Sequence, residues 1–347
     1  MTTAIGIIVA ILCFGFLILT HELGHFLLAR IFDVKVNEFS IGMGPRLFGI
    51  HGKETDYNLR LFPVGGYCAM EGETEDSDDS RSFNAKEPWK RALIILAGAT
   101  VNLLTGFLVM VILVSTFSKI GTTTISSFAE DAPSESQGLQ AGDKVIGVNG
   151  NKILTSMDLA YFMSKDPDGV IDFMVERNGK TVSVDRVKFA TSEDEAGNKS
   201  LQYDFTVEGV KPSFTTVPKY AFLNSLSIFR MVWDSLFDLA RGKYQISDLS
   251  GPVGTVSVIA QTTTSAVKST DYSSLLYLLA LLAINLGVFN LLPFPGLDGG
   301  RFWLIAFEAV TGRKPPKTLE AALNFIGIVA LLGLMLVVTA SDIQKFF

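Results

Sequence analysis

Cysteine and histidine are scarce in this chain, and charged residues make up only 18% of its 347 residues. The two cysteines, Cys13 and Cys68, provide no disulfide framework, which favours a small buried apolar role for the first and an incidental thiol for the second. A net charge of −6 argues against nucleic acid as a partner, because phosphate would be repelled by most of the surface. With 48% hydrophobic residues around a long polar middle, the composition indicates a polytopic membrane protein with a domain outside the bilayer.

Four apolar runs are long enough to cross a bilayer as helices: residues 4–29, 92–117, 275–292 and 322–339. The first run lacks the basic flank and the cleavage site of a signal peptide, so we expect it to be retained. Lysine and arginine concentrate between the first two runs and between the last two. By the positive-inside rule these segments are cytoplasmic, while the N-terminus and the polar middle lie outside.

Two of the three histidines lie inside the first apolar run, in His21-Glu22-Leu23-Gly24-His25. On a helix they are one turn apart on one face, where both can bind one metal ion, and Glu22 lies beside them as a candidate general base. The same pattern also occurs by chance on solvated helix faces without a metal. Polar groups in hydrocarbon need partners, however, and this favours a metal here.

A catalytic zinc site usually has three protein ligands, so the sequence must supply one more. Asp298 is the strongest candidate, because it follows Pro293 and Pro295, which break the third apolar helix. Irregular chain at membrane depth is tolerated where it is buried in protein or lines a cavity. An alternative interpretation is that Asp298 only caps a helix over residues 299–308.

The two motifs together resemble those of the site-2 protease family of intramembrane zinc metalloproteases, of the bacterial RseP type. The resemblance rests on His21-Glu-Leu-Gly-His25 and on Asn290-Leu-Leu-Pro-Phe-Pro-Gly-Leu-Asp298-Gly, and it extends over nearly the whole chain. It implies Zn²⁺ held by His21, His25 and Asp298, with Glu22 activating water. It also implies substrate handling, which we assign to Asn285, Asn290, Pro293, Pro295, Gly42 and Gly44.

The first cytoplasmic segment contains a glycine-rich stretch, residues 38–49, and an alternating run, residues 57–62, before the turn-prone Pro63-Val-Gly-Gly66. These predict a small β-element whose edge strand receives substrate by β-addition, and the resemblance points to a membrane-reentrant loop. The alternative is a sheet that only caps the first helix. Six acidic residues within 71–80 are typical of a solvated linker.

Asn102 lies in the second apolar run beside the small residues Gly98 and Ala99. Small residues permit close helix packing in a membrane. The Asn102 amide is therefore expected either to hold a ligand histidine in place or to bridge two helices.

The polar middle carries a glycine-rich loop, a Val/Ile strand and an Asn-Gly turn over residues 136–150, a helix over 156–165 and a strand over 171–177. These resemble a single PDZ domain over about 121–210, which implies either peptide binding on a sheet edge or exclusion of substrates by size. Apolar residues at helical spacing over 218–243 predict an amphipathic helix on the outer membrane surface. Ser250-Gly-Pro-Val-Gly254 is expected to form a sharp loop without assigned chemistry.

The expected fold is a polytopic α-helical membrane protein with about four transmembrane helices, a small cytoplasmic β-element and one extracytoplasmic α+β PDZ domain. Its predicted parts are a first membrane half, a PDZ domain, a surface helix with linker, and a second membrane half: residues 1–117, 118–212, 213–272 and 273–347. We expect a multi-pass protein of the bacterial cytoplasmic membrane with its active site near the cytoplasmic side.

The expected activity is zinc-dependent endopeptidase cleavage within the membrane. By resemblance, its substrates are single-span membrane proteins already shortened by another protease, such as anti-sigma factors or signal-peptide remnants. A membrane-bound PDZ scaffold that binds peptides and carries a vestigial zinc site is an alternative, against which the intact Glu22 and Asp298 argue. A metal transporter would need polar residues in several spans.

Overall fold

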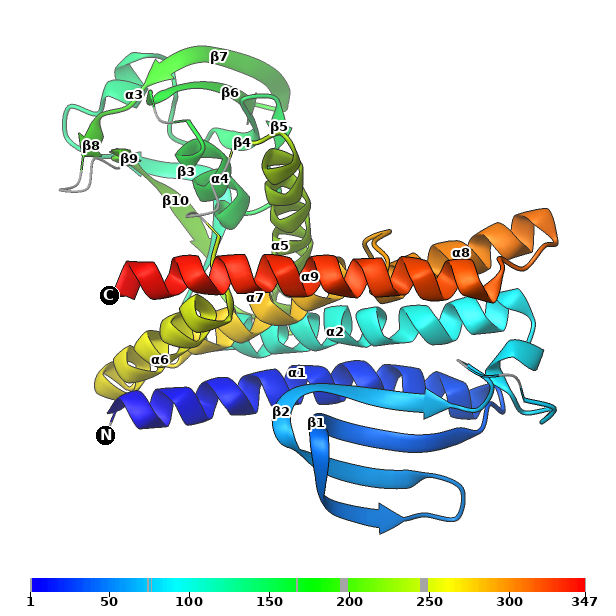
Figure 1. Ribbon diagram of the computed structural model, residues 1–347. Coiled ribbons are helices and arrows are strands. Elements are labelled where there is room, and N and C mark those ends of the chain that lie inside the picture. Colours follow the sequence, from blue (N-terminus) through cyan, green and yellow to red (C-terminus); the bar gives the residue numbers. More distant parts are fainter. Residues whose placement is uncertain are drawn as a thin grey trace. The chain divides into compact units, whose positions relative to one another are not determined.

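The computed structural model is divided by its contacts into two compact units, whose elements are labelled in Figure 1. Unit 1 comprises Met1–Val109 and Ser235–Phe347, and unit 2 comprises Met110–Asp234. The structure describes residues 2–346 except Thr74, Asp76, Pro167, 194–198 and 244–248.

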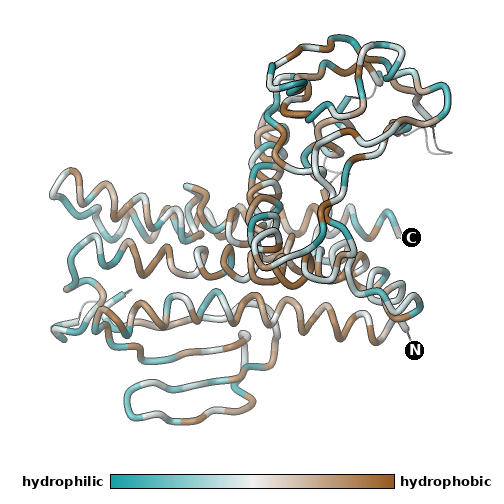
Figure 2. The backbone as a smooth tube through the Cα atoms, turned by 180° about the vertical axis from the view of Figure 1, so that it is seen from behind, coloured by the Kyte–Doolittle hydropathy of each residue, from teal (hydrophilic) through white to brown (hydrophobic). Residues whose placement is uncertain are grey.

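Among the described residues, four helices are long and apolar enough to cross a membrane. They are α1 (Thr2–Ile31), α2 (Pro88–Thr116), α7 (Ser273–Asn290) and α9 (Lys317–Phe346). They coincide with the four predicted apolar runs, and hydrophobic residues predominate along them in Figure 2. The last helix is longer than predicted, because polar turns at both of its ends stay helical.

Helix α7 ends at Asn290, and seven residues separate it from α8 (Asp298–Thr311). Pro293 and Pro295 fall in the connection, where their missing N–H groups cannot continue the helical hydrogen bonds. Helix α8 is capped at its C-terminal end by Gly312, which adopts a left-handed conformation with φ of 67°. The predicted break therefore separates α7 from α8 and leaves Asp298 at the first turn of a new helix.

Strands β1 (Val36–His51) and β2 (Asp56–Met70) form the predicted β-element, an antiparallel ribbon that packs against α1. Both strands bend, so that β1 pairs with β2 in more than one register: Ile41 lies opposite both Gly66 and Leu59. Gly42 and Gly44 allow the bend in β1, with φ of 84° and 85°. The turn expected at 63–66 lies inside β2, because pairing with β1 continues beyond it.

One apolar core joins the elements that surround the histidine motif. It contains buried side chains from α1, β1, β2, α2 and α8, and from the short 3₁₀-helix η1 (Phe83–Ala85): Ala29, Val36, Phe39, Cys68, Met70, Phe83, Ile94, Ile95 and Ile305. Burying each large apolar side chain stabilises the fold by about 1.5–3 kcal/mol. This stabilisation fixes the elements against one another. The core therefore supplies a rigid support for side chains that project from its edge.

The expected loop at residues 250–254 is wrong, because Pro252 begins an 18-residue helix, α6 (Pro252–Ser269). Proline is well suited to the first helical position, where its missing N–H is not needed. The carboxylate of Asp342, on α9 and 1% exposed, accepts the Gly254 N–H at 2.8 Å. A Cβ at Gly251 would lie 2.8 Å from the same carboxylate, so the glycine allows α9 to approach. The region predicted as a linker thus contains a helix that is hydrogen-bonded to α9.

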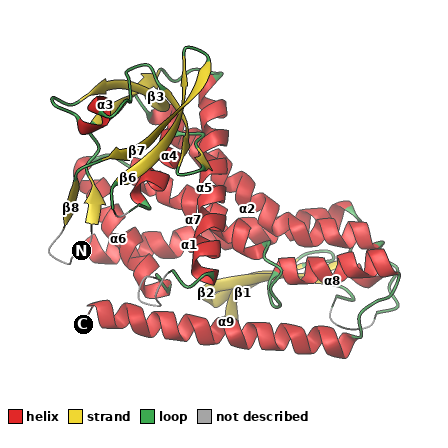
Figure 3. Ribbon diagram, turned by 90° about the horizontal axis from the view of Figure 1, so that it is seen from above, coloured by secondary structure: helices red, strands yellow, loops and turns green. Residues whose placement is uncertain are grey.

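Unit 2 contains an antiparallel sheet (Figure 3). Its side chains form a buried apolar core. Its strands are ordered β10-β3-β4-β6-β7, and β5 pairs with β4. The elements are β3 (Ile120–Phe128), α3 (Pro133–Ser136), β4 (Lys144–Val148), β5 (Asn151–Lys152), α4 (Ser156–Ser164), β6 (Val170–Arg177), β7 (Lys180–Lys188), β8 (Thr191–Glu193), β9 (Lys199–Leu201) and β10 (Phe205–Val210). The predicted Asn-Gly hairpin, helix and strand are confirmed as β4–β5, α4 and β6.

The predicted amphipathic helix is α5 (Thr216–Ala240). Within unit 2 its polar side chains contact α4: Arg230 lies 3.2 Å from the buried carboxylate of Asp158, and Asp234 forms an ion pair with Lys165. The location of α5 on a membrane surface stays a prediction.

Candidate metal centre

Helix α1 brings two imidazoles together, as the spacing of the motif predicts. His21 and His25 are one turn apart, and their Nε2 atoms lie 3.2 Å from each other. The rings meet edge to face at 83°, with centroids 4.8 Å apart. His25 is buried, with 6% of its surface exposed, and the His21 side chain is 12% exposed.

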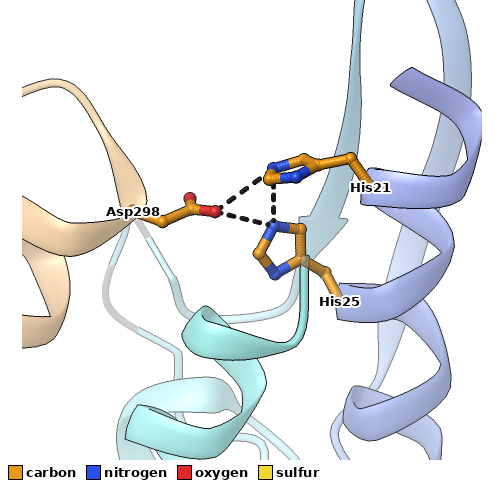
Figure 4. A group of neighbouring side chains, drawn as sticks. All are labelled: His21, His25 and Asp298. Carbon is orange, nitrogen blue, oxygen red and sulfur yellow. Dashed lines mark hydrogen bonds and ion pairs between the residues drawn. The ribbon is translucent and has the colours of Figure 1, made fainter. Parts of the chain in front are cut away.

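Asp298 completes a triangle with the two histidines (Figure 4). Its Oδ2 atom lies 3.2 Å from Nε2 of His21 and 3.2 Å from Nε2 of His25. The interpretation of Asp298 as a helix cap is wrong: Leu297 occupies the cap position, and no side-chain capping hydrogen bond is made there. The Asp298 carboxylate instead reaches two histidines that lie 273 and 277 residues before it in sequence.

The chemistry of these three atoms fits zinc. Nδ1 of His25 donates to the Ile94 carbonyl oxygen at 2.9 Å, so in the neutral ring Nε2 is an acceptor. Oδ2 of Asp298 is buried and has no hydrogen-bond donor. Three acceptor atoms that face one another need a cation between them. Ligands of one tetrahedral zinc, with bonds of about 2.0–2.2 Å, lie about 3.3 Å apart, close to the separations found here.

Asn102 on α2 holds the second imidazole. It is fully buried, and its amide lies 3.2 Å from Nδ1 of His21 and 3.2 Å from Oγ1 of Thr20. Thr20 Oγ1 donates to the Leu17 carbonyl, so it is free to accept from the amide nitrogen. As placed, Nδ2 faces His21 and Oδ1 faces Thr20. The flipped amide, whose oxygen and nitrogen exchange places, satisfies all partners: Oδ1 then accepts Nδ1–H of His21 and leaves Nε2 for a metal. Asn102 thus both holds a histidine and bridges α1 and α2.

Gly98 gives the two rings the space that they occupy. A Cβ added at this position would lie 2.4 Å from Nε2 of His25 and 2.6 Å from Cε1 of His21. Any side chain on α2 at this level would fill the place of the ligand atoms. The small residue predicted to permit helix packing is therefore required by the site itself.

A cavity of about 350 Å³ opens beside the triangle and contains Glu22. The remaining wall comes from strand β2, the turn after it, α2 and α8: Tyr67, Cys68, Ala69, Met70, Glu73, Ile95 and Arg301. The Glu22 side chain approaches β2 closely, since a Cβ at Gly66 would lie 3.1 Å from its Cγ. An acid, three atoms that could hold a metal ion and a β-strand thus share one space.

Sequence reasoning missed Glu73 and Arg301, and assigned no role to Tyr67. Arg301 carried a usable signal, because it follows Asp298 by three residues and therefore lies on the same face of a helix. Glu73 looked like part of a solvated acidic run, and nothing local separates it from its neighbours.

Six predicted substrate residues do not line this cavity in the described part of the chain. Gly42 and Gly44 lie at the bend of β1, and the others lie in α7 or in the connection to α8: Asn285, Asn290, Pro293 and Pro295. Gly327 on α9 fits against this connection, with an added Cβ 1.9 Å from the Pro295 carbonyl oxygen. The roles of the six residues in substrate handling stay predictions.

The comparisons with known proteins cover nearly the whole chain. The model of Peptidase family M50 matches residues 9–334. A Clostridium acetobutylicum protein provisionally named a zinc metalloprotease is 36% identical over 344 residues, which cover 97% of each chain. Zinc metalloprotease RasP of Geobacillus kaustophilus is 30% identical over 99% of this chain and 98% of its own. Regulator of sigma-W protease RasP of Bacillus subtilis is 27% identical over 98% of this chain and 99% of its own.

A solved PDZ domain of the SdrC-like protein from Listeria monocytogenes also matches, at 17% identity, over 26% of this chain and 90% of its own, with a TM-score of 0.19.

Together the helices, the metal centre and these relatives define a bacterial membrane-embedded zinc metalloendopeptidase. The chain belongs to Peptidase family M50, the site-2 protease family, and its relatives of the RasP type place it with the bacterial RseP type.

Proposed function

We propose that this protein cleaves single-span membrane proteins within the bilayer after another protease has shortened them. The observation that carries the proposal is the meeting of His21, His25 and Asp298 with Glu22 in a cavity walled by β2. The sigma-W name of the Bacillus subtilis relative supports anti-sigma factors as the substrate class. Signal-peptide remnants are the second class that we propose.

In this proposal His21, His25 and Asp298 hold the zinc ion, and Glu22 is the general base. Zinc, when bound, supplies a Lewis acid that lowers the pKa of water to about 7 and polarises the scissile carbonyl. Glu22 accepts the proton of the attacking water and passes it to the nitrogen of the leaving amine. The C–N bond breaks as the amine leaves, so one water is consumed for each peptide bond.

Strand β2 is the proposed docking edge for the substrate. On one side its Gly66–Met70 segment pairs with Val36–Ile41 of β1, and Tyr67–Met70 line the cavity on the other. A helical substrate hides its carbonyls in its own hydrogen bonds, whereas a strand added to a sheet edge presents them. Addition to β2 would place an unwound segment beside Glu22. We propose that Gly42, Gly44, Asn285, Asn290, Pro293 and Pro295 handle substrate farther from the scissile bond.

The proposed topology puts the N-terminus and unit 2 outside and the metal centre near the cytoplasmic side. The lysines and arginines of residues 30–91 and 301–317 support it through the positive-inside rule. We propose that residues 118–212 form a PDZ domain that binds an extended peptide or excludes folded chains by size. Residues 1–117 and 273–347 would form the membrane halves, and 213–272 the part between them and the domain.

Purified protein in detergent tests the proposal by its bound zinc and by cleavage of a single-span test substrate. We expect wild type to contain one zinc per chain and to cleave, and Glu22→Gln to retain the zinc and lose cleavage. Stoichiometric zinc without cleavage of several shortened substrates would instead favour the peptide-binding scaffold. Cleavage that survives Glu22→Gln would remove Glu22 from the mechanism.

A further inference from the structure

An ion pair crosses the wall of the catalytic cavity between the end of β2 and the helix that carries Asp298. Arg301 on α8 bonds to the Glu73 carboxylate, and both side chains line the cavity. Arg301 follows Asp298 by three residues, so the two side chains project from the same face of α8 one turn apart. The ion pair is thus the next contact along this face after the metal ligand.

Glu73 is tied to the last residue of β2. Its Oε2 accepts the Met70 N–H at 3.3 Å, its own N–H donates to the Met70 carbonyl at 3.3 Å, and its Oε1 meets Arg301. The Glu73 side chain is 12% exposed and that of Arg301 is 26% exposed. A carboxylate with two separate protein donors in a partly buried place has a defined position, so Glu73 transmits the position of β2 to α8.

The same two residues border a second, smaller cavity of about 30 Å³ on their other side. Glu73 and Arg301 appear in the walls of both cavities, and the smaller one is lined in addition by Arg91, Glu308 and Glu320. The ion pair is therefore a partition between the catalytic space and a polar pocket. Its loss would join the two spaces and free α8 to move relative to β2.

The chain before Asp298 supports it through an irregular segment. The seven residues 291–297 are not helical, so Asp298 is carried by the first turn of α8 and not by a continuous helix. Farther along α8, Glu308 forms a second ion pair with Arg91 of α2 at 2.6 Å, ten residues from Asp298. Arg301–Glu73 acts at the level of the metal ligand, whereas Arg91–Glu308 acts nearly three turns away.

We propose that Arg301 and Glu73 are positioning residues that hold Asp298 in register with the two histidines and with the strand that receives the substrate. Neither residue touches the reacting atoms in this assignment. Part of the inference rests on the proposed function, because the strand is the proposed docking edge. The metal part does not, since ligand placement determines zinc affinity with or without substrate.

Zinc titration of the metal-free full-length protein, with Arg301→Gln and Glu73→Gln, tests the inference. Residues that orient a metal ligand typically contribute about 10–100-fold to metal affinity, so each variant should bind zinc at least about tenfold more weakly. The double variant should bind zinc no more weakly than the single variant with the lower zinc affinity, because both substitutions remove the same contact. In cleavage assays at saturating zinc, kcat should fall more than KM rises.

Arg91→Gln is the matched control. It breaks an arginine–glutamate ion pair that also involves α8, through Glu308, but lies outside the catalytic cavity. It should lower thermal stability without a comparable loss of zinc affinity. Equal zinc affinities for Arg301→Gln and Arg91→Gln would overturn the inference, as would an unchanged affinity in Arg301→Gln. If Arg301→Gln does not fold, Glu73→Gln breaks the same ion pair by a substitution in the turn after β2. A wild type that binds zinc but cleaves nothing would count against the proposed function and leave the titration valid.

Discussion

Asn102 on α2 lies 3.2 Å from Nδ1 of His21 on α1, whereas the partner of His25 is the main-chain carbonyl of Ile94 at 2.9 Å. One imidazole is thus oriented by a side chain and the other by the backbone of the same helix. A mutation can remove the first acceptor, but the second is fixed by the fold of α2. The two ligands are therefore unequally sensitive to substitution.

Asn102→Leu should weaken zinc binding by about 10–100-fold, because Nδ1–H of His21 would lose its acceptor and the ring its orientation. The leucine also leaves that N–H unsatisfied in a buried place. Zinc titration of the metal-free variant measures the change. Thr100→Val, an exposed polar position on the same helix, is the control and should bind zinc as wild type does. Wild-type affinity in Asn102→Leu would show that His21 needs no partner.

Gly98→Ala should abolish tight zinc binding, since its methyl group would lie 2.4 Å from Nε2 of His25. We expect a loss of about tenfold or more in zinc affinity, together with loss of cleavage. Gly15→Ala on α1 is the matched control, because nothing lies within 4 Å of an added Cβ there. It should stabilise α1 slightly, by about 0.5–1 kcal/mol. Zinc content after purification distinguishes the two variants, and equal zinc in both would contradict the crowded site.

Removal of zinc should destabilise the contact between α8 and α1 more than it destabilises unit 2. Zinc at a hundred times its dissociation constant adds about 2.7 kcal/mol to the stability of the state that binds it. Hydrogen exchange with and without chelator measures this effect: amides in α8 and around His21 should exchange faster after chelation. The core strand β6 of unit 2 serves as reference. Acceleration that is equal in β6 and α8 would mean that the metal supports the whole chain and not this contact.

The Glu54 carboxylate should make the stability of the folded protein depend on pH in the acid range. Hydrogen bonds from Arg81, and then from Arg30, lower the pKa of this carboxyl group from 4.5 to about 2. Because its pKa is lowered on folding, its contribution is complete above pH 4.5 and is lost as the pH falls toward 2. The melting-temperature difference between wild type and Glu54→Gln should therefore be small but constant near neutrality, since the pair is exposed, and should vanish near pH 2. A difference that grows in acid would contradict this assignment.

The meeting of His21, His25 and Asp298 could be predicted from sequence because each of the two segments carries a local signal. His21 and His25 are spaced by one helical turn, and Asp298 follows the two prolines that break the third apolar helix. The Asn149-Gly150 pair likewise predicts the β4–β5 hairpin from local sequence. Glycine alone predicts less, because the turn expected at residues 63–66 lies inside β2.

The remaining features depend on contacts between distant residues. Glu73 and Arg301 are 228 residues apart, and a lone glutamate in an acidic run has no pattern that selects its partner. Helix α6 is not predicted because the sequence Ser250-Gly-Pro-Val-Gly254 is typical of a loop, although proline also favours a helix start. The carboxylate that decides between the two interpretations belongs to Asp342, 88 residues after Gly254.

Asp342 lies in the last turns of the last helix, yet its carboxylate holds the first turn of α6. Helix α6 in turn packs along α1, where a Cβ on Gly6 would lie 2.5 Å from the Cα of Ala260. The final residues of the chain are therefore a poor site for truncation or for a rigid fusion partner. A shortening that removes Asp342 would release α6 and loosen the start of the helix that carries both histidines.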